Sequence, residues 1–370
     1  MDNFTNLPIL NMALAQCPQT KPQFLSELRD ALVRVGFFYL TNHQLPDDVQ
    51  QEAMQQAGAF FALPMDTKLK VDRIHNRHFF GYSRSASEIT EGEADYSEGF
   101  LTGSDALAPG PDQPVYLNLQ GPSQWPDPQA APGFREAMER YRSAMDRLSA
   151  EFAGLIEEAL GLEPGSITKL FGTSQRNDLS LRKYLPPSPE NEAEAEYRQG
   201  IGAHKDVSVV TYLLQQSQHN CLEVQNKQGA WISVPPRPGS LVVNIGRILE
   251  AMTAGICAAT VHRVVLKSEG FVDTNGASLG PRLSIAFFQD VNLRLRLDDL
   301  SLEIPSHVAA LRRGEKVVSS VEDWGEGLFD RTIGDSHFVD YLTGFPDVGE
   351  RWYPEILPLA VNKLAGLQAV

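Results

Sequence analysis

The sequence predicts a mainly β fold, a barrel or jelly roll with helical decoration. The first observation is a series of short β-rich runs after Leu179, which Gly, Pro, Asn and Ser separate. The second is a helix-rich first half, in which apolar residues recur at helical spacing. The third is the size, 370 residues of which 42% are hydrophobic and 21% charged, which suffices for one large or two small packed domains. We expect a single domain.

The expected elements follow the chain in order. Apolar stripes predict helices at 22–35, about 47–61 and 134–156. Gly36 ends the first stripe before a strand at 37–40, and residues from about 77 to 128 are predicted to form loops and short turns. The later strands are expected at LSLRKYL, IGAH, VSVVTYLL, LEVQ, WISV, SLVVNI, ATVHRVVL and RLSIAFF, and a covering helix at EILPLAVNKLAGL. We divide the chain into an N-terminal helical and loop region (1–130), a long helix (131–178), a β core (179–297) and a C-terminal strand and helix cover (298–370).

Charge and cysteine content exclude several classes of function. The 32 basic and 47 acidic residues give a net charge of −15, which repels nucleic acid and anionic lipid. We see neither a signal peptide nor a run of about 20 apolar residues, so we expect a cytoplasmic protein without a membrane partner. The three cysteines, Cys17, Cys221 and Cys257, lie far apart, which favours buried, reduced thiols over a disulfide framework or a zinc site.

Three residues are candidate metal ligands. His204 and Asp206 are two apart beside a strongly β stretch, so on extended backbone their side chains point the same way. His262 interrupts the apolar strand ATVHRVVL, where an imidazole needs a hydrogen bond or a metal to offset its desolvation. Taken singly, His262 reads better as a hydrogen-bonded core histidine. Together, two histidines and a carboxylate suit non-haem Fe(II), and the HExxH spacing of hydrolytic zinc sites is absent.

A fourth element follows in RLSIAFF. Strand alternation places Arg282, Ser284, Ala286 and Phe288 on one face of the sheet and the intervening apolar residues on the other. An arginine on an inward face requires an anionic partner, and its donors match the two oxygens of a carboxylate. The alternative is an ion pair with a protein acid at the rim.

With these motifs in this order, the sequence resembles the Fe(II)/2-oxoglutarate-dependent dioxygenases of the isopenicillin N synthase-like family. The resemblance runs from LRDALVRVGFFYLTNH through LRKYLPP and GAHKDVSVVTYLLQ to RLSIAFFQD, most of the chain. It implies a double-stranded β-helix (jelly-roll, cupin-like) core, Fe(II) held by His204, Asp206 and His262, and 2-oxoglutarate bound by Arg282 and Ser284. Tyr184, in LRKYLPP, matches a position that often contacts cosubstrate or substrate, although packing alone explains many such tyrosines.

The activity that the resemblance implies is oxidation of a small organic, secondary-metabolite substrate by hydroxylation, desaturation or ring closure. O2 and 2-oxoglutarate are consumed, succinate and CO2 are released, and ascorbate is the expected reductant. Two alternatives stay open: an iron oxidase of the isopenicillin N synthase type that needs no 2-oxoglutarate, and a non-catalytic binding module on the same scaffold. The sequence does not specify the substrate or the oligomeric state.

The expected substrate pocket combines a candidate lid with apolar walls. Residues 79–100 are a candidate lid, with a solvated loop as the equal alternative. Leu213, Leu241 and Phe288 are candidate apolar walls, of which the two leucines read better as barrel core. Arg247 stands where plant members commonly have an acid. The candidate pocket residues are Phe80, Tyr82, Arg84, Tyr96, Leu213 and Phe288.

Overall fold

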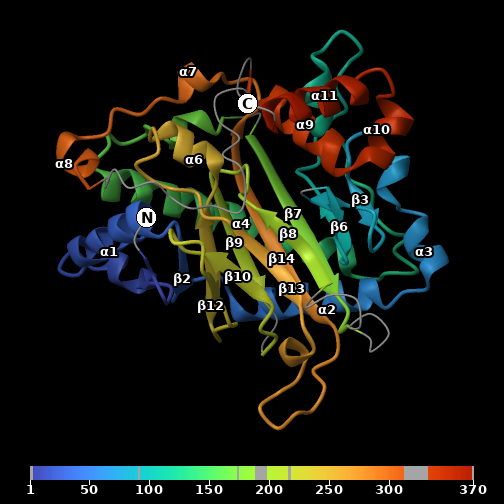
Figure 1. Cartoon of the computed structure of the whole chain (residues 1–370), viewed down its shortest axis with the longest axis horizontal. Helices are drawn as coiled ribbons and strands as arrows, with labels where there is room; N and C mark the ends of the chain where they lie inside the picture. Colours follow the sequence, from blue (N-terminus) through green and yellow to red (C-terminus); the bar gives the residue numbers. More distant parts are fainter. Residues whose placement is uncertain are drawn as a thin grey trace.

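Two facing β-sheets form the centre of the molecule (Figure 1). The computed structural model describes residues 3–90, 92–172, 175–187, 198–215, 218–311 and 332–368. Within them, the larger sheet has the strand order β1-β2-β12-β9-β14-β7-β6-β3 and the smaller one the order β11-β10-β13-β8. Among the described strands of these two sheets, neighbours are antiparallel except β1 and β2. This is the expected jelly roll.

The strands have the following bounds. In the larger sheet they are β1 Ile9–Asn11, β2 Phe37–Thr41, β3 Gly81–Ser83, β6 Glu98–Thr102, β7 Gln175–Tyr184, β9 Val210–Gln215, β12 Ser240–Ile245 and β14 Arg282–Asn292. In the smaller sheet they are β8 Arg198–His204, β10 Leu222–Gln225, β11 Trp231–Ser233 and β13 His262–Leu266. A separate hairpin pairs β4 Ile89–Thr90 with β5 Glu93–Ala94.

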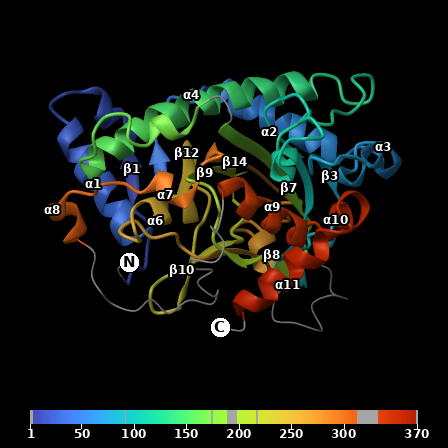
Figure 2. The ribbon, with the colours of Figure 1, turned by 90° about the horizontal axis from the view of Figure 1, so that it is seen from above.

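Helices surround this core. The α-helices are α1 Lys21–Arg34, α2 Asp47–Phe61, α3 Met65–Leu69, α4 Phe134–Leu160, α6 Arg247–Met252, α7 Leu297–Leu300, α8 Ser306–Ala309, α9 Ile333–Gly344, α10 Pro346–Trp352 and α11 Leu357–Gln368. Short 3-10 turns are η1 Met12–Gln16, η2 Arg73–His75, η3 Val115–Leu119, η4 Thr168–Leu170 and η5 Ser268–Phe271. Figure 2 shows α4 and α2 along one side of the sheets and α9, α10 and α11 on the other. The stripes at 22–35, 47–61 and 134–156 therefore did form helices, and the expected C-terminal helix is α11.

The main hydrophobic core lies between the larger sheet and helices α1, α2 and α4. It combines buried side chains of α4, such as Met145 and Phe152, with Leu283, Ile285 and Phe287 of β14. A second cluster lies between the two sheets, where Phe37 of β2 is grouped with apolar residues of β10 and β13. The alternation expected for RLSIAFF is confirmed, because its apolar set belongs to the helix-covered face.

The expectation of loops and turns at 77–128 was wrong in part. Strands β3 and β6 lie in this segment and extend the larger sheet, with Phe100 of β6 opposite Leu181 of β7 and Tyr82 of β3 opposite Phe100. Phe100 and Tyr82 are fully buried. Their short runs have too little alternation to be recognised locally. Pairing with β7, some 80 residues later, stabilises β6, and pairing with β6 stabilises β3.

Gly36 makes the corner between α1 and β2. Its φ is +71°, in the left-handed region that favours glycine, and a Cβ there would lie 2.0 Å from the Ala258 carbonyl oxygen. The stop that the sequence placed at Gly36 therefore has a steric cause, a close approach of the chain before β13.

Two further expectations were tested by the structure. Among the described residues we find no helical segment with the length and apolarity that crossing a bilayer requires. The three cysteines are free, but Cys17 is exposed, so only Cys221 and Cys257 are the buried thiols that we expected. The part of the C-terminal region at 312–331 lies outside the described residues.

Candidate active site

A cavity of about 630 Å³ opens between the two sheets. This volume lies within the range of small-molecule sites, roughly 300–1,000 Å³. Strands of both sheets, the β4–β5 hairpin and the C-terminal helices all contribute to its wall. The lining includes Phe37, Glu88, Ile89, Asp95, Leu101, Ser180, Arg182, Tyr184, His204, Asp206, Thr211, Leu213, Asn244, Arg247, His262, Arg282, Ser284, Ala286, Phe288, Asp340, Tyr341 and Phe345.

The smaller sheet brings the three candidate metal ligands together. His204 is the last residue of β8, His262 is the first of β13, and the two are register partners. Asp206 follows β8 by two residues. His204 Nε2 lies 3.3 Å from Asp206 Oδ1, and His262 Nε2 lies 3.6 Å from the same oxygen. One ligating atom from each residue therefore lies within 4.8 Å of the other two.

The remaining polar atoms of these residues are held by the protein. The Nδ1 atoms of His204 and His262 lie 2.8 and 3.2 Å from the carbonyl oxygens of Gly202 and Thr260. Each ring therefore donates through Nδ1–H to the backbone, and Nε2 is the atom that faces Asp206.

The two carboxylate oxygens of Asp206 also have separate roles. Its Oδ2 accepts hydrogen bonds from Thr211 Oγ1 at 2.6 Å and from Asn244 Nδ2 at 2.8 Å. Oδ1 is left facing the two Nε2 atoms. Two imidazole nitrogens and one carboxylate oxygen aimed at a common point match the donor set of a non-haem Fe(II) centre.

The protonation tendencies agree with this arrangement. Burial would raise the pKa of Asp206, but the two histidines and the Asn244 hydrogen bond hold it well below its usual range. Burial, and then the neighbouring His204, lowers the pKa of His262 to about 4. Burial also opposes protonation of His204, yet its hydrogen bond to Asp206 raises the pKa of that ring. Asp206 is therefore ionised and His262 neutral, as ligation requires.

The larger sheet supplies an arginine to the same cavity. Arg282, at the start of β14, is 1% exposed, and its Nη2 donates to Gln215 Oε1 at 3.0 Å. Its Nε and Nη1 are buried without a hydrogen-bond partner among the described residues. Tyr184, its register partner on β7, stacks on the guanidinium at 4.7 Å. A buried guanidinium with two unused donors fits a carboxylate ligand.

Tyr184 and Ser284 complete this end of the cavity. Both line it, and both are buried. Burial raises the pKa of Tyr184 above its ordinary value, while the positive charge of Arg282 opposes that shift. The phenol therefore stays protonated beside the arginine, as a hydrogen-bond donor.

Of the six candidate pocket residues, Leu213 and Phe288 line the cavity. The other four do not. Phe80 is buried against Gly103, the Tyr82 hydroxyl donates to Glu98 Oε2 at 2.8 Å, Arg84 pairs with Asp72, and Tyr96 stacks under Arg198. The aromatic residues of 79–100 are thus used in packing, and the segment reaches the cavity through Glu88, Ile89, Thr90, Gly92 and Asp95 instead.

Several cavity residues were missed by sequence reasoning. Thr211 and Asn244 lie on strands whose alternation does point them inward, so the same two-residue spacing that selected Arg282 and Ser284 would have found them. Arg182 is inward by the same rule, two residues before Tyr184. Arg247 forms an ion pair with Asp340 of α9 at 2.8 Å, which no local signal indicates because the partners are 93 residues apart.

Comparison with known proteins agrees with this geometry. Residues 176–291 match the model of the 2OG-Fe(II) oxygenase superfamily, and residues 7–128 match that of the non-haem dioxygenase in morphine synthesis N-terminal domain. The chain is 50% identical over 363 residues to a 2-oxoglutarate-dependent dioxygenase of Gibberella zeae, covering 98% of this chain and 95% of that protein. It is 33% identical to clavatol oxidase claD of Penicillium crustosum, covering 75% and 82%.

A solved structure shares the fold. A full-length Neurospora crassa protein, solved in complex with alpha-KG, superposes with a TM-score of 0.68 at 22% identity, covering 86% of this chain and 95% of that one. The chain belongs to the 2OG-Fe(II) oxygenase superfamily. It is an Fe(II)- and 2-oxoglutarate-dependent oxidoreductase of the dioxygenase class.

Proposed function

We propose that His204, Asp206 and His262 hold Fe(II) and that Arg282, with Ser284 and Tyr184, binds the distal carboxylate of 2-oxoglutarate. The observation that carries the proposal is the fully buried Arg282, which faces the same cavity as the three ligating atoms and keeps two donors unused among the described residues. An unpaired buried charge costs several kcal/mol. A dianionic cosubstrate offsets that cost.

The donor set favours iron over zinc. The two histidines come from different strands and the carboxylate from a loop, whereas the hydrolytic zinc motif places its histidines one helical turn apart. His204, Asp206 and His262 would hold the metal through three protein atoms, which would leave it accessible to 2-oxoglutarate and O2. When bound, Fe(II) with 2-oxoglutarate supplies the oxidation of a substrate C–H bond, with release of succinate and CO2.

The protein's part is to bind, orient and exclude water. Thr211 and Asn244 hold the Asp206 carboxylate, and backbone carbonyls hold both imidazole rings. Leu213, Ala286 and Phe288 give the neighbouring wall an apolar surface. A dry, apolar wall beside the metal keeps the oxidising chemistry on the bound substrate.

The substrate is proposed to be a small organic molecule of secondary metabolism, oxidised by hydroxylation, desaturation or ring closure. The 33% identity to clavatol oxidase supports this class. We further propose ascorbate as the reductant and a cytoplasmic location without nucleic-acid or membrane partners, which the net charge of −15 supports.

The test is 2-oxoglutarate turnover by the Fe(II)-loaded protein, measured as succinate and CO2. Asp206→Ala and His204→Ala are expected to abolish turnover, because each removes a metal ligand. Arg282→Ala is expected to raise the 2-oxoglutarate KM by two orders of magnitude or more, since breaking a buried charge pair costs about 3–5 kcal/mol. Undiminished turnover in a ligand variant would reject the metal assignment.

Arg263→Ala is the matched control. Arg263 is next to His262 on β13, but its guanidinium pairs with Glu223 and does not line the cavity. Its loss should leave the 2-oxoglutarate KM within about twofold of the wild type. The same assay separates the two alternatives: an oxidase of the isopenicillin N synthase type would consume O2 without forming succinate, and a binding module would not hold stoichiometric iron after anaerobic Fe(II) addition.

A further inference from the structure

Arg182 is a second guanidinium on the cavity wall. It lies on β7 two residues before Tyr184, so it is on the same inward face, and its register partner on β14 is Ser284. It therefore lies one row further along the sheet from Arg282, about 6–7 Å on strand spacing. Its side chain is 17% exposed and lines the cavity.

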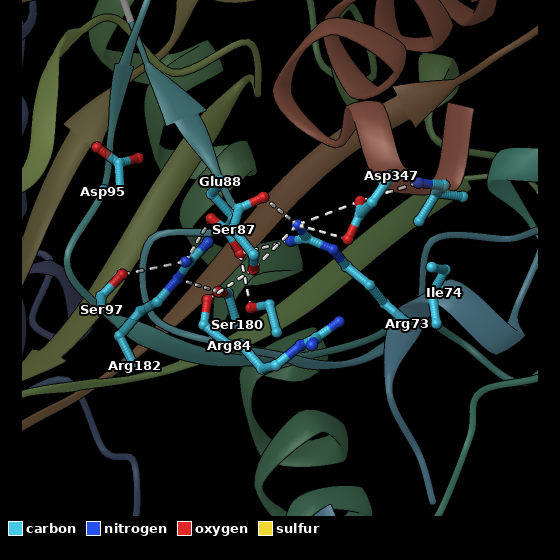
Figure 3. Close-up of polar contacts among 12 residues, drawn as sticks. Arg73, Ile74, Arg84, Ser87, Glu88, Asp95, Ser97, Ser180, Arg182 and Asp347 are labelled. Atoms are coloured by element: carbon cyan, nitrogen blue, oxygen red, sulfur yellow. Dashed lines mark hydrogen bonds and ion pairs between the residues drawn. The ribbon is translucent and has the colours of Figure 1, made fainter. Parts of the chain in front are cut away.

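The contacts of Arg182 leave one nitrogen unused. Figure 3 shows its guanidinium between Ser97, Ser180 and the carboxylate of Glu88. Nε donates to Ser180 Oγ at 3.1 Å, and Nη1 donates to Glu88 Oε2 at 2.5 Å and weakly to Ser97 Oγ at 3.5 Å. Within the described part of the chain, Nη2 makes no hydrogen bond.

The acid that pairs with Arg182 also pairs with a second arginine. Glu88 is shared, because its Oε1 also accepts from Arg73 Nη1 at 3.0 Å (Figure 3). Arg73 has a second acid, Asp347 of α10, at 3.4 Å. Asp95, the next acid on this wall, already accepts from Thr90, Gln199 and the Gly202 amide. Among the described residues, Arg182 therefore has one ion-paired acid, and it shares that acid with Arg73.

The other cavity arginines have their own uses. Arg247 is paired with Asp340, and Arg282 is assigned to the cosubstrate. The cavity lining also includes the apolar side chains of Ile89, Leu101, Ala286, Phe288 and Phe345. A ligand that fills this space has an apolar body and one anionic group.

We propose that Arg182 is a substrate-binding residue, and that the substrate of this enzyme is an apolar carboxylic acid whose carboxylate accepts a hydrogen bond from Arg182 Nη2. This inference rests on the proposed function and specifies the substrate class of the same cavity. Arg182 holds the acid end on the larger sheet, and the apolar body lies along Phe288 and Phe345. The carboxylate adds a second acceptor to a guanidinium that otherwise shares one acid with Arg73.

A purely structural role for Arg182 is the competing explanation. In that case Arg182 only ties the β4–β5 hairpin to β7 through Glu88, and the cavity has no preference for acids. Arg73 provides the matched control, because it contacts the same carboxylate while lying outside the cavity lining. Arg73→Gln weakens the same tie without changing the cavity wall.

The experiment compares carboxylic acids with their methyl esters. The probes are 1-naphthoate, 3-phenylpropanoate and 4-phenylbutanoate, each against its ester. Binding to the Fe(II) and 2-oxoglutarate complex is measured by calorimetry without O2, and substrate-stimulated succinate formation is measured in air. The wild type is expected to bind at least one acid at least ten times more tightly than its ester. That acid should also speed up succinate formation.

Arg182→Gln is expected to weaken binding of that acid about 30-fold or more while changing ester binding little, since removing one partner of a desolvated charge pair costs 2 kcal/mol or more. Arg73→Gln is expected to retain the preference for the acid. Arg182→Lys keeps the charge beside Glu88 and decides the matter if the Gln variant does not fold: acid binding should fall several-fold, because an ammonium lacks the planar donors of a guanidinium.

Three outcomes would overturn the proposal. The first is that the wild type binds no acid more tightly than its ester. The second is that Arg73→Gln and Arg182→Gln lose the preference for the acid equally. The third is that Arg182→Gln loses as much affinity for 2-oxoglutarate as for the acid. Failure of the proposed function is recognised separately, as absence of succinate formation by the wild type without any probe.

Discussion

At the scale of single residues, the candidate metal centre depends on which polar atom of each side chain contacts the protein and which one stays available for the metal. His204, His262 and Asp206 each use one atom for the protein and direct the other to a common point. Strand spacing and a histidine in an apolar run were enough to single out the three candidate ligands, which the fold brings together. The atoms that hold Asp206 could not be predicted, because Thr211 and Asn244 come from β9 and β12 and meet it only in the folded chain.

Thr211→Val tests whether the hydrogen bond to Asp206 Oδ2 supports metal binding. Valine has the shape of threonine but cannot donate to Asp206 Oδ2, so the carboxylate loses one of its two fixed contacts. Loss of a partner that orients a ligand typically costs 10–100-fold in metal affinity, and we expect the Fe(II) Kd to rise by about that factor. Anaerobic Fe(II) titration measures it. Thr211→Ser keeps the hydroxyl and should bind iron as the wild type does; equal affinity in all three proteins would contradict the assigned role.

At the scale of elements, the alternation of β7 and β14 builds both faces of the larger sheet. Arg282, Ser284 and Phe288 face the cavity, while Leu283 and Ile285 enter the core against the helices. A period of two is a local property, so the sequence predicted these faces correctly. Strands β3 and β6 escaped prediction because the register of β6 comes from β7 and that of β3 comes from β6. The corner at Gly36 was predicted as a stop, but its close contact with Ala258 was not.

Gly36→Ala is expected to be strongly destabilising. A Cβ would lie 2.0 Å from a carbonyl oxygen of the chain, and the backbone would also be held at a positive φ. Gly239→Ala is the matched control, with φ +69° but no atom within 4 Å of the added Cβ. We expect the control to lose about 1 kcal/mol from backbone strain and Gly36→Ala to lose clearly more, about 3 kcal/mol. Urea unfolding measures both, and equal losses would show that the contact with Ala258 relaxes freely.

At the scale of the whole molecule, one ionic cluster joins four segments that are far apart in sequence. Arg73 of η2, Glu88 before β4, Arg182 of β7 and Asp347 of α10 meet beside the cavity (Figure 3). Burial would raise the pKa of Glu88, but Arg182 and Arg73 hold it below its ordinary value. The cluster therefore couples the hairpin and the C-terminal helices to the sheet through a charge that acid removes.

The free energy of unfolding at acid pH should depend on this ionic cluster. Because the pKa of Glu88 is lowered in the folded state, its contribution to the free energy of unfolding is complete above its ordinary pKa and is lost as the pH falls through the lowered value. Glu88→Gln should reduce stability at pH 7 by about 3 kcal/mol, the lower end of the range for a broken buried pair. It should also lose less stability than the wild type between pH 5.5 and about 3. Urea unfolding across this range is the measurement, and parallel pH profiles would disprove the coupling.

The sequence by itself determined the fold class, the helices and strands with strong periodicity, and the residue types of the candidate site. These depend on patterns two to four residues long, because the periods of strands and helices fix which side chains share a face. Only the tertiary structure decided which partners meet: the pairing of β6 with β7 and β3, the residues that hold Asp206, the ion pair of Arg247 with Asp340, and the cluster around Arg182. Those contacts join segments tens to hundreds of residues apart, and their free energy exists only once the chain has brought them together.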